Sequence, residues 1–222
     1  FAAALALGLR PEVGLYRPGT SQFFLDYNLD HAVDAMATFG APGDTGLSGD
    51  LDGNGVSDLV LYRNGTWFID SNLTATVTAQ VGFGGVGGDI PLLGDMNGDG
   101  RDDLIIYRSG TWYVNFNPGA ANVDAVYHFG GVAGDIPLVG DLNGDGKLDL
   151  IIYRNGVWYV SNNPNAVSVD AVYQFGGVPG DVPMVFDYDG DGRDDLVIYR
   201  NGTWFVCTKL NCTGPDVITF IY

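Results

Sequence analysis

The sequence is poor in histidine and glutamate, two side chains that enzymes often use for proton transfer. It has two histidines, His31 and His128, far apart in the chain, and Glu12 is its single glutamate. No Gly-x-Ser-x-Gly motif occurs, and the glycine-rich segments lack the lysine and helix of a phosphate-binding loop. We therefore expect a non-enzymatic protein, although a glycosidase site made of two aspartates stays open.

Positive charge and long apolar runs are also scarce. Lys and Arg number 10 against 27 Asp and Glu, for a net charge of -17, which argues against nucleic acid and anionic membrane surfaces as partners. No apolar run reaches the roughly 18 residues of a membrane span. Because hydrophobic residues make up 46% of the chain, disorder is not expected. Without a starting Met or a basic leader, the chain is expected to be a mature product or a piece of one.

The two cysteines, Cys207 and Cys212, have no histidine or further cysteine at zinc-binding spacing. A disulfide across a short loop is the natural interpretation, and it predicts an extracellular, secreted or cell-surface protein. Two reduced thiols are the alternative. Four segments match the Asn-x-Thr glycosylation pattern, although two of them are Asn-Gly hairpin turns that the backbone alone explains. Their asparagines are Asn64, Asn72, Asn201 and Asn211.

Four loops carry oxygen-bearing side chains on alternate residues. They span residues 50–58, 95–103, 141–149 and 187–195, and we call them loops 1 to 4. Each has Asp or Asn at positions 1, 3, 5 and 9 and glycine at position 6, as a chain needs to fold around a hard divalent cation. The predicted ligands are Asp50, Asp52, Asn54 and Asp58; Asp95, Asn97, Asp99 and Asp103; Asp141, Asn143, Asp145 and Asp149; Asp187, Asp189, Asp191 and Asp195.

Two other interpretations of these loops are less favoured. The helical calcium hand needs Glu at position 12 and flanking helices, but position 12 is Ile106 in loop 2 and Ile198 in loop 4. The flanking residues are also typical of strands. A metal-free Asp-Gly turn is the second alternative. It does not explain why three or four carboxylates, which repel one another, are crowded together.

A Tyr-Arg pair recurs along the chain about every 46 residues, from Tyr16-Arg17 to Tyr199-Arg200. Each full copy has four strand-like segments, as at 136–140, 150–153, 158–160 and 171–175, with a two-residue hairpin turn between the second and third. This predicts an all-β, five-bladed β-propeller of four-stranded antiparallel blades. The blades are placed at about 1–43, 44–88, 89–134, 135–180 and 181–222, within one domain spanning residues 1–222.

The motifs of each copy also resemble a known family. Phe-Gly, Gly-Asp-x-Pro and Asp-x-Asn/Asp-Gly-Asp-Gly-x-x-Asp follow one another, which is similar to the FG-GAP, or VCBS-type, repeat of integrin α-subunit propellers and many bacterial secreted proteins. The resemblance covers roughly residues 11–222. It implies four Ca²⁺ sites, one in each of loops 1 to 4, and none in the first copy, where residues 8–12 replace the loop. Such propellers serve adhesion, sugar binding and catalysis alike.

The aromatic residues and the N-terminal segment each allow more than one interpretation. The Tyr-Arg pairs and the four tryptophans favour packing between blades, with stacked sugars as the alternative. Residues 1–9 are uncharged and are expected to supply the first strand of the first blade, beside residues 13–16. Donation of this strand to a neighbouring molecule, which would build a fibre, is the second interpretation, and a signal-peptide remnant is the third. The tryptophans are Trp67, Trp112, Trp158 and Trp204.

Together these patterns predict an extracellular, calcium-binding β-propeller without enzymatic activity. It would be a structural or assembly subunit, or a cell-surface interaction module, with a homopolymer or another protein as its partner through residues 1–9. A carbohydrate-binding adhesion module, with glycans as partners, is the alternative. A glycan-active hydrolase is less favoured than either.

Overall fold

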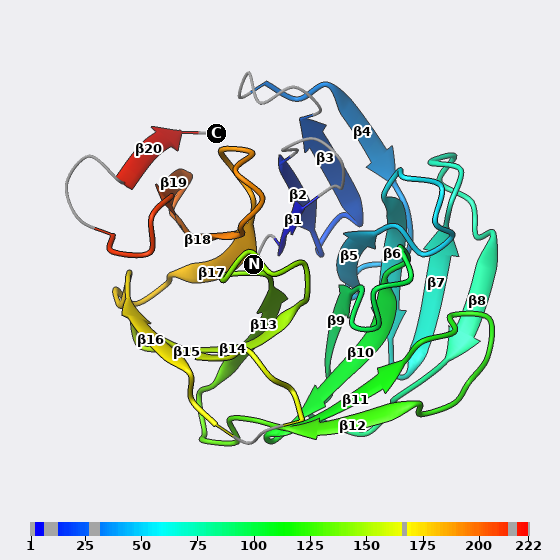
Figure 1. Cartoon of the computed structure of the whole chain (residues 1–222). Helices are drawn as coiled ribbons and strands as arrows, with labels where there is room; N and C mark the ends of the chain where they lie inside the picture. Colours follow the sequence, from blue (N-terminus) through cyan, green and yellow to red (C-terminus); the bar gives the residue numbers. More distant parts are fainter. Residues whose placement is uncertain (1–2, 7–12, 27–31, 166–167, 213–216, 222) are drawn as a thin grey trace. The chain divides into compact units, whose positions relative to one another are not determined.

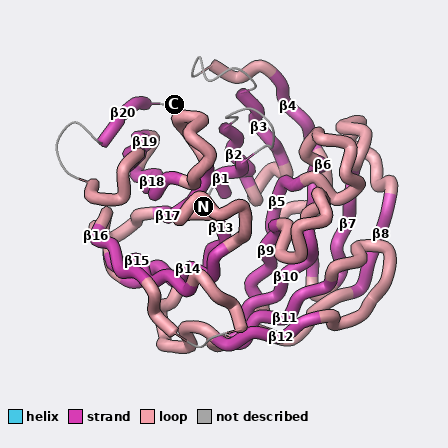
Figure 2. Tube along the Cα trace, in the orientation of Figure 1, coloured by secondary structure: helices cyan, strands magenta, loops and turns pink. Residues whose placement is uncertain are grey.

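The computed structural model describes residues 3–6, 13–26, 32–165, 168–212 and 217–221. Within these ranges the chain is all-β, and its strands form five four-stranded sheets, each ordered as in the sequence (Figure 1). Figure 2 shows that loops and turns join the strands. The predicted fold class, five four-stranded blades of a β-propeller, is confirmed. Among the described residues no helix has the length and apolar character to cross a membrane.

The first three sheets contain strands β1 to β12. Their bounds are β1 Ala3–Ala6, β2 Val13–Arg17, β3 Gln22–Asp26, β4 Ala35–Thr38, β5 Thr45–Gly49, β6 Asp58–Arg63, β7 Thr66–Asp70, β8 Ala79–Gly82, β9 Ile90–Gly94, β10 Asp103–Arg108, β11 Thr111–Asn115 and β12 Ala125–His128. The last two sheets contain β13 Ile136–Gly140, β14 Asp149–Arg154, β15 Val157–Ser161, β16 Ala171–Gln174, β17 Val182–Phe186, β18 Asp195–Arg200, β19 Thr203–Cys207 and β20 Val217–Ile221.

The chain forms two compact units. One contains residues 1–108 and 113–126, and the other contains residues 109–112 and 127–222. Loops 1 and 2 lie in the first unit, and loops 3 and 4 lie in the second. Within each unit the first strands of successive blades contact one another, β1 with β5, β5 with β9, and β13 with β17. The two loops of a unit therefore follow neighbouring first strands.

The second strand of each blade is buried on both faces, as its run of apolar residues predicts. In β14, residues 149–153 are all buried, and the strand lies between β13 and β15 in its sheet. Pro137 lies in β13, an edge strand, where a residue without an N–H does not interrupt the ladder. In four blades the third strand adds a fully buried tryptophan, such as Trp158 in β15, and in the first blade it adds Phe23. Burying each such side chain stabilises the blade by about 1.5–3 kcal/mol.

The predicted two-residue hairpin turns are confirmed. Asn64 and Gly65 have φ values of 49° and 87°, as the favoured hairpin turn requires, and Ser109, Asn155 and Asn201 also have positive φ. The turn packs tightly against the glycine-rich link that leaves the same blade. A Cβ added at Gly65 would lie 2.6 Å from the Cα of Gly85. Only two glycines allow the backbones to approach this closely.

The N-terminal strand β1 pairs antiparallel with β2 of the same chain, from Ala3 opposite Tyr16 to Ala6 opposite Val13. This is the pairing that the first interpretation of residues 1–9 predicts. It completes the four strands of the first blade. The remaining residues of the segment, 1–2 and 7–9, lie outside the described residues, as do His31 and Glu12.

Candidate calcium loops and the Asp–Arg network

The aspartate at position 1 organises each loop through its carboxylate. Asp50 accepts hydrogen bonds from the backbone N–H groups of Gly53, Asn54 and Gly55, at 2.8, 3.1 and 2.7 Å. The same three bonds recur in the other loops at 2.7 to 3.2 Å, where the acceptors are Asp95, Asp141 and Asp187. The loop is thus folded around this carboxylate.

Glycine is needed at two positions of the loop. Position 6 has φ from 78° to 86°, as the sequence predicts, at Gly55, Gly100, Gly146 and Gly192. Position 4 also has positive φ, from 76° to 79°, at Gly53, Gly98, Gly144 and Gly190. Sequence reasoning missed position 4, although glycine stands there in all four loops. A side chain would strain the backbone at either position.

The aspartate at position 9 begins the second strand of the blade and is buried. Its Oδ2 accepts the N–H of position 2, as in Asp103 with Met96 at 2.8 Å. The Oδ1 atoms of Asp58 and Asp103 are buried and have no hydrogen-bond partner. A buried carboxylate oxygen without a partner is costly unless a cation balances it. The four residues at this position are Asp58, Asp103, Asp149 and Asp195, exposed by 1, 0, 0 and 3%.

Burial raises the pKa of these position 9 carboxyls, and neighbouring carboxylates in the same loop raise it further. The pKa of Asp58 rises to about 6, and those of Asp103, Asp149 and Asp195 rise to about 7. The hydrogen bond from position 2 opposes the shift without cancelling it. A group that must be ionised at neutral pH in such surroundings needs a positive charge beside it.

Loop 4 brings three of its four predicted ligands together. Oxygen atoms of Asp187, Asp189 and Asp195 lie within 4.8 Å of one another, the only such group of three or more acidic, His or Cys side chains among the described residues. In loop 3 the amide Nδ2 of Asn143 instead donates to Asp149 Oδ1 at 3.1 Å. A flip of the Asn143 amide would turn its oxygen, in place of its nitrogen, toward the other ligands. Because all the other candidate ligands are Asp or Asn, each loop can then offer oxygen atoms alone, which suit a hard cation.

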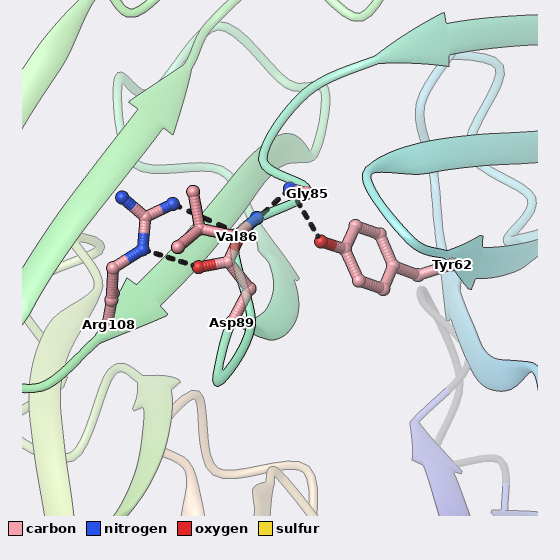
Figure 3. A network of polar contacts seen from close by, with 5 residues as sticks. All are labelled: Tyr62, Gly85, Val86, Asp89 and Arg108. Atoms are coloured by element: carbon pink, nitrogen blue, oxygen red, sulfur yellow. Dashed lines mark hydrogen bonds and ion pairs between the residues drawn. The ribbon is translucent and has the colours of Figure 1, made fainter.

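A second aspartate network involves the Tyr-Arg pairs, and Figure 3 shows one copy. Arg108 donates from Nε and Nη2 to Asp89 at 2.6 and 3.1 Å, and the N–H groups of Gly85 and Val86 donate to Asp89 Oδ2. Gly85 also donates to the hydroxyl of Tyr62 of the preceding blade, at 3.1 Å. Corresponding ion pairs join Asp44 to Arg63, Asp135 to Arg154 and Asp181 to Arg200.

The sequence singled out the arginine of each pair but not its aspartate, which is the Asp of Gly-Asp-x-Pro or its equivalent. Burial alone would raise the pKa of Asp89, but the hydrogen bonds from Arg108 and the backbone lower it below its usual value. Each arginine also lies over an aromatic ring of the third strand, Arg108 over Tyr113 at 5.0 Å. The Tyr-Arg pairs therefore hold the blades together, as the packing interpretation predicts.

The tryptophans are buried rather than available to a sugar. All four are 0% exposed, and the indole N–H of Trp67 donates to the carbonyl of Phe83 at 2.9 Å. Trp112 and Trp158 make the same bond to Phe129 and Phe175. The interpretation in which the tryptophans stack on sugars is therefore wrong.

The cysteine prediction involves one buried residue, whereas the asparagine predictions fall on the surface. Cys207 and Cys212 form the predicted disulfide. Cys207 ends β19 and is buried, and the residues that end β7, β11 and β15 are equally buried: Asp70, Asn115 and Ser161. The four asparagines of the glycosylation pattern are exposed, as a glycan requires. The threonine of the fourth pattern, at position 213, lies outside the described residues.

The decisive comparison is with a repeat family. Residues 95–152 and 141–198 match the FG-GAP-like repeat. Residues 95–198 carry FG-GAP-like repeats. Each match begins at the first residue of a loop, Asp95 or Asp141, and extends through the loop of the following blade. The FG-GAP-like repeat thus includes the candidate ligands and the second strand that follows them.

Solved structures share the fold of these FG-GAP-like repeats at low sequence identity. A glutaminyl cyclase from Myxococcus xanthus matches with a TM-score of 0.64 and 12% identity, covering 100% of this chain and 92% of that one. An Agrocybe aegerita lectin that recognises non-reducing terminal N-acetylglucosamine matches with a TM-score of 0.55 and 19% identity, covering 96% and 67%. The calcium-binding protein regucalcin from Agrobacterium tumefaciens matches with a TM-score of 0.52 and 11% identity, covering 94% and 71%. No curated protein matches the sequence.

Proposed function

We propose that this protein is an extracellular, non-enzymatic calcium-binding propeller that acts as a structural or assembly subunit. The observation that carries the calcium proposal is the buried position 9 carboxylate, whose Oδ1 has no partner in Asp58 and Asp103. The fold supplies an arginine to Asp44, Asp89, Asp135 and Asp181, but among the described residues it supplies none to these carboxylates. Calcium is a hard cation that takes six to eight oxygen ligands, and the loops offer oxygen alone.

The chain's own residues would divide the work of holding Ca²⁺. When bound, the ion supplies the positive charge that the clustered carboxylates lack. The position 1 aspartate fixes the loop backbone through its three hydrogen bonds. Side chains at positions 3 and 5 accept a backbone N–H two residues on, as Asp52 does from Asn54 and Asn54 does from Val56. The second oxygen of each aspartate, the remaining lone pair of each asparagine oxygen and the position 9 carboxylate would complete the set.

A structural role agrees with how the acidic residues are used. In the four blades that contain loops 1 to 4, the buried aspartates have one of three roles. They lie in a loop, form an ion pair with arginine, or accept hydrogen bonds from a connection between strands, as Asp70 does from the N–H groups of Asn72 and Ala75. His128 is exposed and lies 3.5 Å from the hydroxyl of Thr111. We therefore propose no catalytic residue. The disulfide and the exposed asparagines support an oxidising, extracellular location.

Assembly would use the N-terminal strand. β1 is short and is held to β2 by backbone pairing over four residues. The same pairing can form with β1 of another molecule, because exchange of an identical strand requires no new contacts. Head-to-tail exchange that does not close produces a filament. Deleting residues 1–9 should then yield a folded protein that no longer forms large particles on native sizing, whereas unchanged particles would contradict the strand's role.

Metal content and thermal stability test the calcium proposal directly. Elemental analysis of protein purified without chelator should find calcium, and chelation should lower the melting temperature, since the emptied loops leave carboxylates repelling one another. Asp195→Ala should remove about one ion per chain. No metal and an unchanged melting curve in excess chelator would contradict the proposal.

Carbohydrate binding is the second candidate. A pocket of about 350 Å³ in the second unit is lined by Ser109, Thr111, His128 and Ser168, whose polar groups are able to hydrogen-bond a sugar. If this function is correct, binding on a glycan array should be lost in His128→Ala. Calcium removal should weaken it only through the stability of the fold. If no glycan on the array binds, carbohydrate binding is refuted and the structural role is the remaining candidate.

A further inference from the structure

The loops contact each other in pairs. In the first unit, the N–H of Asp50 donates to Asp102 Oδ2 at 2.8 Å, and the N–H of Asp102 donates to the carbonyl of Asp50 at 2.7 Å. In the second unit, Asp141 and Asp194 exchange the same two bonds at 2.7 and 2.8 Å. Each pair joins position 1 of one loop to position 8 of the next. We call this double hydrogen bond the interloop clamp.

The surrounding residues leave room for the interloop clamp. Gly49 precedes Asp50, and a Cβ at Gly49 would collide with the carboxylate of Asp102. Likewise, Gly140 precedes Asp141, and a Cβ at Gly140 would lie 2.7 Å from Asp194 Oδ2. The arginine before the clamping aspartate also reaches the preceding loop, since a Cβ at Gly53 would lie 3.0 Å from the Cγ of Arg101. In each pair, two consecutive side chains of the second loop therefore contact the first loop or the residue before it: Arg101 and Asp102 in loop 2, Arg193 and Asp194 in loop 4.

The interloop clamp has one direction within each pair. Position 8 is Asp102 in loop 2 and Asp194 in loop 4, but it is Ser57 in loop 1 and Leu148 in loop 3. Serine and leucine have no carboxylate with which to accept the N–H of a preceding loop. The sequence therefore divides the four loops into two pairs, and each pair lies within one compact unit.

We propose that loops 1 and 2 bind Ca²⁺ as one coupled pair and loops 3 and 4 as another, an inference that rests on the calcium function proposed above. Asp50 is a ligand of loop 1, and Asp102 adjoins Asp103, the buried ligand of loop 2. Ordering Asp50 around an ion fixes the N–H and C=O that hold Asp102, and so positions Asp103. By linkage, each loop of a pair must strengthen the other equally.

The orphaned oxygens support both members of the first pair independently of the interloop clamp. Asp58 Oδ1 in loop 1 and Asp103 Oδ1 in loop 2 are both buried without a partner. In the second pair, loop 4 gathers three carboxylates within 4.8 Å. Asp102 and Asp194 are then positioning residues, which act on the sites through Asp50, Asp103 and their counterparts.

A site-resolved Ca²⁺ titration tests the coupling. The backbone amide resonances of Gly55, Gly100, Gly146 and Gly192 report loops 1 to 4 in full-length, ¹⁵N-labelled protein. Asp52→Ala removes an exposed ligand of loop 1 and should weaken Ca²⁺ binding at Gly100 about fivefold or more, the usual size of such coupling. Binding at Gly146 and Gly192 should be unchanged. Asp145→Ala in loop 3 should weaken the Ca²⁺ binding reported by Gly192 and leave that reported by Gly100 unchanged.

Breaking the interloop clamp should remove the coupling. In an Asp102→Leu background, adding Asp52→Ala should no longer weaken Ca²⁺ binding at Gly100. The control is Leu148→Ala, because position 8 of loop 3 takes no part in the interloop clamp, and it should leave the coupling intact. If Asp102→Leu does not fold, the two single-ligand variants still decide the question. Equal effects of Asp52→Ala on Gly100 and Gly146 refute pairing but not calcium binding. No Ca²⁺ response at any of the four glycines refutes both.

Discussion

Two sets of aspartates in the same blades have buried side chains but opposite pKa shifts. In the network of Figure 3, Asp89 has a side chain 2% exposed and a lowered pKa, because Arg108 and backbone N–H groups hold its charge. In loop 2, Asp103 is 0% exposed and its pKa rises to about 7. Burial by itself raises the pKa of both carboxyls. The difference is that the chain supplies a cation to the first carboxylate and leaves the second without one.

Chelation at different pH values should show the largest effect. In the metal-free folded chain, Asp103, Asp149 and Asp195 have a pKa of about 7, against 3.8 in the unfolded chain. The folded state therefore binds more protons between these values, and its stability should fall as pH rises from 5 to 8. The four ion-paired aspartates have lowered pKa values, so their contribution changes only in stronger acid.

Thermal melts in excess chelator and in millimolar Ca²⁺ check this prediction. With Ca²⁺ bound, the trend should disappear or reverse, because acid displaces the ion. The gap between the two curves should therefore be widest near pH 8. At that pH, saturation well above the dissociation constant adds about 2.7 kcal/mol or more for each site. Parallel curves at every pH would show that the loop carboxylates are not balanced by the metal.

Removing the chain's own cation should have the next largest effect. Arg108→Ala leaves Asp89 buried and unpaired, which should lower the free energy of unfolding by about 3 kcal/mol, with or without Ca²⁺. Arg17 is the matched control, because it occupies the same strand position and lies over Phe24 at 4.3 Å. Among the described residues no carboxylate forms an ion pair with Arg17. Arg17→Ala should cost about 1 kcal/mol or less in urea denaturation.

Neutralising one aspartate of each set sharpens the contrast. Asp89→Asn loses a charged acceptor for Arg108 and should destabilise the protein by about 1–3 kcal/mol at pH 8. Asp103→Asn removes a charge that the metal-free loop cannot balance, so it should raise stability in chelator while abolishing the gain from Ca²⁺ at loop 2. Urea denaturation of both variants, with and without Ca²⁺, measures the change in the free energy of unfolding. If both variants change it in the same direction in chelator, the distinction between the two sets of aspartates is wrong.

Sequence reasoning succeeded where a pattern is local and failed where partners are distant. The nine-residue loops, the hairpin turns and the doubly buried second strands depend on neighbours in the chain, so spacing and residue type predict them. Asp89 and Arg108 are 19 residues apart, and Asp50 and Asp102 are 52 apart. Nothing in the local pattern distinguishes Asp102 from a solvated charge beside Asp103. Only the folded arrangement of neighbouring blades brings it to the backbone of Asp50.

The residue that ends the third strand decides how each blade responds to its chemical surroundings. In three blades a polar side chain secures the following connection through hydrogen bonds, as Asn115 does with the carbonyl of Ala120. In the last blade a covalent bond from Cys207 does so. A reductant would therefore loosen one connection, that between β19 and β20, and leave the others untouched. Among the described residues, sensitivity to a reductant is confined to the connection that follows β19.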